Sequence, residues 1–143
     1  MKTFSILTVL FTAFISHFSQ ANALISSAPE HAELYFISPQ NGAAINGEVE
    51  VVFGLKGMGV APAGVDKKHT GHHHLIINKE ISELDLSMPL PANENVKHFG
   101  GGQTQTTLKL PKGTHTLQLL LGNFAHVPHN KPVMSKQITI TVK

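Results

Sequence analysis

The chain has 143 residues, with 11 Lys and Arg in total, nine Asp and Glu, and no cysteine. All 11 basic residues are lysines, Trp is absent, and Tyr35 is the only tyrosine. A nucleic-acid-binding domain usually carries an arginine-containing basic surface with stacking aromatic residues, so we exclude that class. Because cysteine is absent, the chain forms no disulfide and carries no cysteine-linked lipid anchor. Its stability must come from an apolar core, or from a core and a bound ligand.

The first 23 residues have the three parts of a cleavable export signal. Lys2 supplies a positive charge, residues 4–18 form an apolar run, and Ala21-Asn22-Ala23 is a small-x-small cleavage pattern. The alternative is a membrane anchor, but the run is shorter than the roughly 20 apolar residues that span a bilayer. We expect cleavage after Ala23, no membrane anchor, and a periplasmic or secreted product of 143 − 23 = 120 residues.

Residues 24–32 are predicted to form a flexible leader, and residues 33–143 a single domain. From residue 33 onward, apolar and polar side chains alternate with the period of two that is typical of strands. Strands are predicted at 34–37, 49–55, 72–77, 104–110, 114–121 and 138–142. Pro111-Lys112-Gly113 is predicted to be a hairpin turn.

The intervening segments are rich in turn residues. Residues 56–71 are predicted to be a long Gly- and Pro-rich loop, and residues 78–103 to be irregular, with one helical turn near 81–86. About seven short strands without a confident helix predict an all-β fold. An immunoglobulin-like β-sandwich is the natural way to bury the apolar faces of such strands.

Histidine density is the main chemical feature of the sequence. Ten histidines are present; His17 lies in the predicted signal, and eight of the other nine fall between positions 69 and 129. Those eight are His69, His72, His73, His74, His98, His115, His126 and His129. A neutral imidazole keeps a lone pair that binds zinc, copper or nickel. The enrichment therefore predicts a metal site, although no fixed zinc-finger spacing is present.

Strand geometry sorts the histidines further. Side chains alternate along a strand, so His72 and His74 share one face and His73 shares the other with Leu75 and Ile77. If the Leu75 face is inward, His73 lies at the rim of the core, and His72 and His74 form an outer pair that can hold one ion. His115 is in line with the alternating leucines of the 114–121 strand and is also expected at the rim.

The predicted site is a transition-metal centre for copper or zinc in a binding domain that is not an enzyme. Its candidate ligands are His72, His73, His74, His98, His115, His126 and His129. The alternative is an envelope interaction or structural module in which the histidines only brace loops. An enzyme would need an open metal position beside an acid such as Asp66 or Glu94. Soft copper ligands could come from Met58, Met88 and Met134.

Five blocks of the sequence resemble those of an exported bacterial family called domain of unknown function 4399. The blocks are Phe53–Val60, Gly71–Ile77, His98–Thr104, Pro111–Leu119 and His126–His129. The resemblance implies export and a compact all-β domain, without an established activity. In the family pattern an Asp follows the histidine-rich strand and another precedes the last block, whereas Asn78 and Asn123 stand here. A carboxylate that hydrogen-bonds to a metal-binding imidazole and orients it is therefore less expected. A looser similarity, to small periplasmic copper carriers, rests on residues 38–43.

Overall fold

The computed structural model describes residues 24–143, and the predicted signal peptide and its cleavage site lie outside these described residues. The described part is all-β, with one named 3-10 turn, η2 (Ile81–Glu83). Its strands are β1 (Glu33–Ser38), β2 (Ala44–Ile45), β3 (Val49–Lys56), β4 (Gly59–Val60), β5 (Thr70–Ile77), β6 (Val96–His98), β7 (Gln105–Leu108), β8 (Gly113–Gly122) and β9 (Ile138–Val142). Within residues 24–143, no helix is long and apolar enough to cross a membrane.

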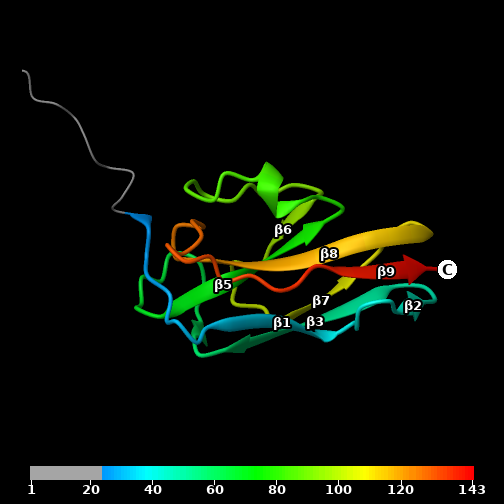
Figure 1. Cartoon of the computed structure of the whole chain (residues 1–143), viewed down its shortest axis with the longest axis horizontal. Helices are drawn as coiled ribbons and strands as arrows, with labels where there is room; N and C mark the ends of the chain where they lie inside the picture. The colour runs from blue at the N-terminus through cyan, green and yellow to red at the C-terminus, as the bar shows by residue number, and fades with distance from the viewer. Residues whose placement is uncertain (1–23) are drawn as a thin grey trace, which may run out of the picture.

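The strands form two sheets, seen as two layers in Figure 1. The smaller sheet has the order β1-β3-β7, and both of its pairs are antiparallel. The larger sheet has six strands, in the order β2-β9-β8-β5-β4, with β6 paired to β5. The β5 and β8 strands are antiparallel neighbours in the middle of this sheet, with Leu75 opposite Leu119. The most deeply buried strand of the domain, β5, therefore carries the histidine run.

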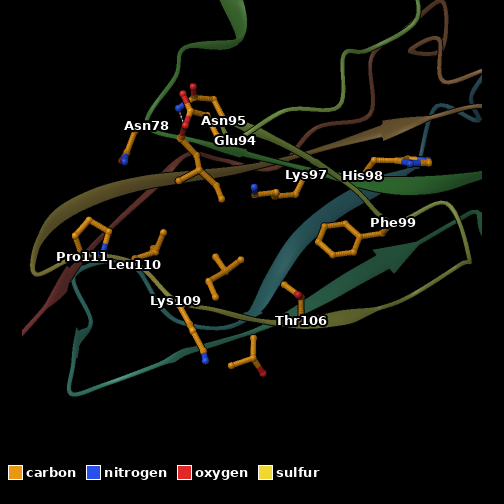
Figure 2. A pocket seen from close by; sticks show the side chains of 13 residues that line it. Asn78, Glu94, Asn95, Lys97, His98, Phe99, Thr106, Lys109, Leu110 and Pro111 are labelled. Carbon is orange, nitrogen blue, oxygen red and sulfur yellow. Dashed lines mark hydrogen bonds between the residues drawn. The ribbon is translucent and has the colours of Figure 1, made fainter.

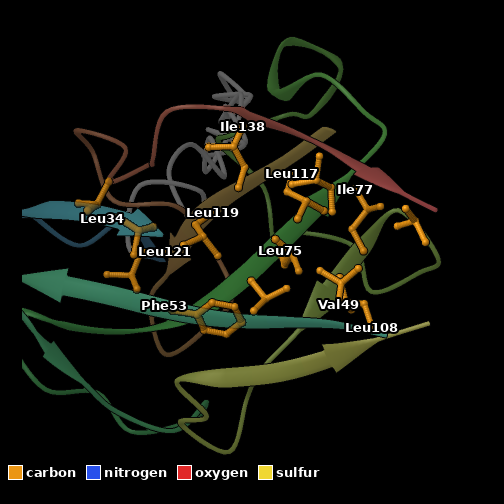
Figure 3. Packing of buried hydrophobic residues seen from close by; sticks show 14 residues of the cluster. Leu34, Val49, Phe53, Leu75, Ile77, Leu108, Leu117, Leu119, Leu121 and Ile138 are labelled. Carbon is orange, nitrogen blue, oxygen red and sulfur yellow. The ribbon is translucent and has the colours of Figure 1, made fainter. Parts of the chain in front are cut away.

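The main core lies between the two sheets, as the packed side chains in Figure 3 show. The smaller sheet contributes Leu34, Val49, Val51, Phe53 and Leu108, and the larger one contributes Leu75, Ile77, Leu117, Leu119, Leu121, Ile138, Ile140 and Val142. The predicted alternation in residues 49–55 and 114–121 is confirmed, because this core contains every second residue of each strand: Val49, Val51 and Phe53 of β3, and Leu117, Leu119 and Leu121 of β8. Val133, from the loop before β9, completes the cluster.

A second, smaller apolar cluster lies on the outer face of β5 and β8. Ile76 and Leu120 point away from the main core because side chains alternate along each strand, and they are fully buried by Leu90 and Val96. Ile81, Leu84 and Leu86 pack around them. The segment from η2 to β6 therefore covers the outer face of the large sheet, and this cover extends the buried region to both sides of β5.

Three local predictions differ from the structure. The turn at Pro111-Lys112-Gly113 is not a hairpin, because β7 belongs to the small sheet and β8 to the large one. The loop predicted at 56–71 contains β4, which pairs in parallel with β5. The irregular segment at 78–103 contains η2 and β6. In the last two cases the strands are only two and three residues long, too short for alternation to be recognised.

Residues 24–32, predicted as a leader, lie along the loop that follows β8. The Asn123 side-chain amide donates to the backbone oxygen of Leu24 at 2.6 Å. The backbone N–H of Asn130 donates to the oxygen of Ser26 at 2.9 Å. Ala28 packs against the main core. This segment therefore contacts the loop that carries His126.

Candidate metal centre

Four histidines converge on the outer face of β5. His72 and His74 come from β5, His98 from the end of β6, and His126 from the loop after β8. One ring nitrogen from each of the four lies within 4.8 Å of the chosen nitrogens of the others. We call this group the four-histidine cluster. It combines the predicted i, i+2 pair, His72 and His74, with two histidines that are distant in the sequence.

Strand pairing explains how these side chains meet. His74 lies opposite His98 in the β5–β6 register, and His72 lies opposite Gly122 in the β5–β8 register. Residues directly opposite in neighbouring strands place their side chains on the same face. At Gly122 a side chain is missing, and a Cβ there would lie 2.7 Å from Cε1 of His74. The glycine therefore leaves the space that the His74 ring occupies.

The four rings surround a common point in a nearly tetrahedral pattern. Five of the six ring-centroid separations lie between 4.5 and 5.1 Å, and only His74–His126 is longer, at 6.1 Å. Four rings in a square plane would give two long diagonals, each about 1.4 times the side. The pair that would form the second diagonal, His72–His98, is separated by 5.0 Å. The arrangement is therefore close to the geometry that Zn²⁺ adopts.

Burial is uneven across the cluster. His72 and His74 are fully buried, His126 is partly buried and His98 is exposed. Nδ1 of His72 and both ring nitrogens of His74 are buried without a hydrogen-bond partner. An unpaired buried polar group costs about 1–3 kcal/mol. A ligand that accepts lone pairs at this point would remove part of that cost.

Burial also fixes the charge state of these imidazoles. Burial, followed by repulsion from the neighbouring rings, lowers the pKa of His72 to about 4 and that of His74 to about 3. Burial and the nearby His126 lower the pKa of His98 as well. These rings are therefore neutral at pH 7, the form that binds a metal ion without first releasing a proton.

A backbone outlier and a side-chain amide place His126. Its φ of 64° lies in the left-handed region, which few residues other than glycine adopt. The Asn123 carboxamide oxygen accepts bonds from the backbone N–H groups of Ala125, at 2.9 Å, and Val127, at 3.1 Å. The backbone oxygen of His126 accepts a bond from Leu90 at 2.9 Å. The loop thus holds His126 toward β5.

Three of the predicted ligands lie outside the cluster. His73 points to the opposite face of β5, where its ring is 5.0 Å from that of Phe53. It is fully buried rather than at the rim, and neither ring nitrogen has a hydrogen-bond partner. Burial lowers the pKa of His73 to about 4. The backbone of Gln103 acts to raise this pKa, but it forms no hydrogen bond with the ring. His73 is therefore a neutral core residue.

His115 and His129 brace loops, as the alternative interpretation expects. Nδ1 of His115 lies 3.0 Å from the amide nitrogen of Asn78, and its Nε2 lies 2.8 Å from the carbonyl oxygen of Pro111. Nε2 of His129 lies 3.3 Å from the carbonyl oxygen of Thr70. Asn78 thus orients His115, and Asn123 orders the His126 loop.

The acidic candidates take no part in the cluster, and the three methionines lie against the core or at the surface. Within the described residues, the group of potential ligands consists of imidazoles alone. Asp66 and Glu94 line two separate surface pockets. Met58 packs against the main core, whereas Met88 and Met134 are exposed. Sequence reasoning named all four cluster histidines, but it gave no role to Gly122, whose place opposite His72 depends on pairing.

A groove of about 640 Å³ runs between β6 and β7, where the edges of the two sheets face each other. Figure 2 shows Phe99 over this groove and the His98 ring at one end. Its charged lining residues are Glu94, Lys97 and Lys109, and Lys109 is 3.2 Å from Glu48. Because positive and negative side chains both line the groove, it favours neither an anionic nor a cationic ligand.

Fold and site together define an all-β domain with a cluster of four imidazoles. The chain belongs to the family described as Domain of unknown function (DUF4399), whose profile matches residues 51–143. No curated protein matches the sequence. Among solved structures, the chain is similar to part of an endo-beta-1,4-mannanase from Thermotoga petrophila, at 20% identity and a TM-score of 0.45. The similarity covers 78% of this chain but 20% of the mannanase, and it carries no argument about function.

Proposed function

We propose that this domain binds one transition-metal ion, zinc or copper, through His72, His74, His98 and His126. The observation that carries the proposal is the burial of His72 and His74 with unpaired ring nitrogens beside two further imidazoles. A buried polar group without a partner is uncommon and requires an explanation. A metal ion at the centre of the cluster accepts one lone pair from each ring.

The bracing role does not account for these four residues. A bracing imidazole pairs at least one of its nitrogens with a loop, as His115 does with Asn78 and Pro111 and as His129 does with Thr70. By contrast, His74 pairs neither nitrogen. The hydrogen-bonding contact between the rings of His72 and His126 joins two ligand candidates to each other rather than to a loop.

Of the two metals, zinc suits the arrangement better. Zn²⁺ is almost always tetrahedral in structural sites, with Zn–N distances of about 2.0–2.1 Å, whereas Cu²⁺ with nitrogen ligands favours a square plane. Tetrahedral nitrogens at that distance lie about 3.3 Å apart. One ring nitrogen from each histidine lies within 4.8 Å of the others, and Nε2 of His72 is 3.1 Å from Nδ1 of His126.

The function is proposed to be binding rather than catalysis. Four imidazoles complete a tetrahedral shell, whereas a catalytic zinc keeps one position open for water or substrate. The two acids that the sequence offered, Asp66 and Glu94, do not belong to the group of potential ligands. These observations favour binding over catalysis.

The cellular setting is part of the proposal. Lys2, the apolar run and Ala21-Asn22-Ala23 support export to the periplasm or the exterior. The two facing sheets support an immunoglobulin-like sandwich as the finer fold assignment. The absence of cysteine means that imidazoles are the strongest nitrogen or sulfur metal ligands of this chain.

Titration calorimetry on the exported protein, purified without a histidine tag, tests the proposal. Zn²⁺ is expected to bind at one ion per chain. Cu²⁺ usually binds a given set of ligands more tightly than Zn²⁺ does, and this advantage should be smaller at the four-histidine cluster. The His74→Asn variant should lose this binding. His69→Asn, which changes an exposed histidine outside the cluster, is the matched control and should retain it. A protein that binds neither ion would overturn the proposal.

A further inference from the structure

The four ligand candidates divide into two unlike pairs. His72 and His74 are fully buried on the central strand β5, with β8 on one side and β6 on the other. His98 is exposed at the last residue of the edge strand β6, and His126 is only partly buried. The cluster therefore has a closed inner side and an accessible outer side.

The accessible pair is also the closest pair. The ring centroids of His98 and His126 lie 4.5 Å apart, the shortest separation in the cluster. Beside them, Gly100 keeps the surface low, because a Cβ at that position would collide with the His98 ring. A ligand atom from outside can therefore approach the centre from the side of His98 and His126 without displacing any buried side chain.

We propose that the metal is a cargo, exchanged with a second metal-binding protein by replacement of His98 and His126. This inference rests on the proposed function of the same site. His72 and His74 stay bound, while an imidazole or thiolate of the partner forms a bond to the ion as the bond from His98 breaks. His126 leaves in a second, equivalent step. Each leaving imidazole departs neutral, so the exchange changes neither oxidation state nor proton count on this chain.

A site that only stabilises the fold would have a different arrangement. Structural zinc sites are closed, with all ligands supplied by the protein and held within it. Here half of the ligands are reachable from solvent. Moreover, the main core between the sheets lies on the other face of β5 from the cluster, so the packing of the two sheets does not depend on the ion.

The test is the kinetics of zinc transfer from the loaded, full exported protein to the coloured chelator 4-(2-pyridylazo)resorcinol. Replacement through the accessible pair predicts a first-order rate that rises in proportion to chelator concentration. His98→Asn should accelerate the transfer at least tenfold, because one of the two displaceable ligands is already gone. His69→Asn should leave the rate unchanged. The apo form of His98→Asn should unfold at the same denaturant concentration as the parent apo protein.

Two results overturn the inference while leaving zinc binding intact. One is a transfer rate that does not depend on chelator concentration in the parent protein and in His98→Asn, which would mean that the ion leaves by spontaneous dissociation. The other is a His98→Asn variant whose rate equals that of the parent. A protein that takes up no zinc in calorimetry would instead overturn the proposed function, and this inference with it.

Discussion

Nε2 of His72 and Nδ1 of His126 lie 3.1 Å apart, although 54 positions separate the two residues in the sequence. Rings in contact at this distance share one proton, so one ring donates and the other accepts. Both nitrogens cannot bind the same metal ion while that proton remains between them. Binding through these atoms therefore requires one ring to move its proton to its other nitrogen.

This relationship predicts a change of tautomer when zinc binds. In the apo protein, long-range proton–nitrogen NMR should show one of the two facing nitrogens protonated and the other not. Saturation with Zn²⁺ should give both rings one metal-bound and one protonated nitrogen. If both rings keep their apo tautomers in the presence of one equivalent of zinc, these atoms are not the ligands.

His74→Leu is predicted to stabilise the apo protein and to remove zinc binding. Both ring nitrogens of His74 are buried without a partner, and leaving such groups unpaired costs about 1–3 kcal/mol. Leucine has no polar atom to leave unpaired, so the free energy of unfolding should rise by an amount in that range. Urea denaturation of the metal-free proteins measures it. A variant less stable than its parent would support bracing by His74 instead.

Gly122→Ala is predicted to weaken zinc binding by at least tenfold. The added methyl group would lie 2.7 Å from Cε1 and 3.1 Å from Nδ1 of His74, and it would push the ring away from the centre of the cluster. Gly59→Ala is the matched control, because its methyl group would meet only Thr70 Cγ2 at 3.3 Å and a backbone oxygen at 4.0 Å. Equal zinc affinities in the two variants, measured by competition with a chelator, would contradict the geometry.

The stability of the apo protein is predicted to fall in acid. Burial lowers the pKa of His72 and His73 to about 4 and that of His74 to about 3, whereas the unfolded chain titrates near 6.5. The unfolded state therefore binds more protons below pH 6.5. Stability is complete above that pH and is lost as the pH falls toward 4, by up to about 1.4 kcal/mol per pH unit for each ring.

Urea denaturation at pH 7.5, 6 and 5 measures this slope. His73→Leu should make the slope shallower without altering zinc affinity, because His73 lies on the face of β5 opposite the cluster. A free energy of unfolding that stays constant between pH 7.5 and pH 5 would show that these rings are protonated in the folded state.

His115→Ala is predicted to separate stability from metal binding. The change removes the contacts of the ring with Asn78 and Pro111, each of which contributes about 0.5–1.5 kcal/mol. The unfolding free energy should fall by about 1–3 kcal/mol, while calorimetry gives the zinc affinity of the parent. Loss of zinc binding in a folded His115→Ala protein would place His115 in the site after all.

The sequence predicted the longer strands and placed His72 and His74 on one face, because both depend on alternation within one segment. Alternation also predicted the inward residues of β3 and β8. It could not predict the path of the chain after β7, because Pro111-Lys112-Gly113 is the same turn signal whether the chain returns in its own sheet or crosses to the other. The short strand β6 gave no periodic signal, although it delivers His98.

The division of the seven candidate histidines was also beyond the sequence. His126 and His115 both lie near strand ends, and only tertiary contacts distinguish the cluster residue from the bracing residue. His126 reaches β5 because Asn123 orders its loop. His115 is occupied by Asn78, a residue 37 positions away. The ligand set therefore follows from pairings across the chain rather than from any local spacing.

The most direct test of the account is X-ray absorption at the zinc edge of the protein loaded with one equivalent of Zn²⁺. The four-histidine cluster predicts four nitrogen ligands at about 2.0–2.1 Å with the outer-shell scattering of imidazole rings, and three such ligands in His98→Asn. A first shell dominated by oxygen, or one with fewer than three imidazoles in the parent protein, would contradict the proposed centre.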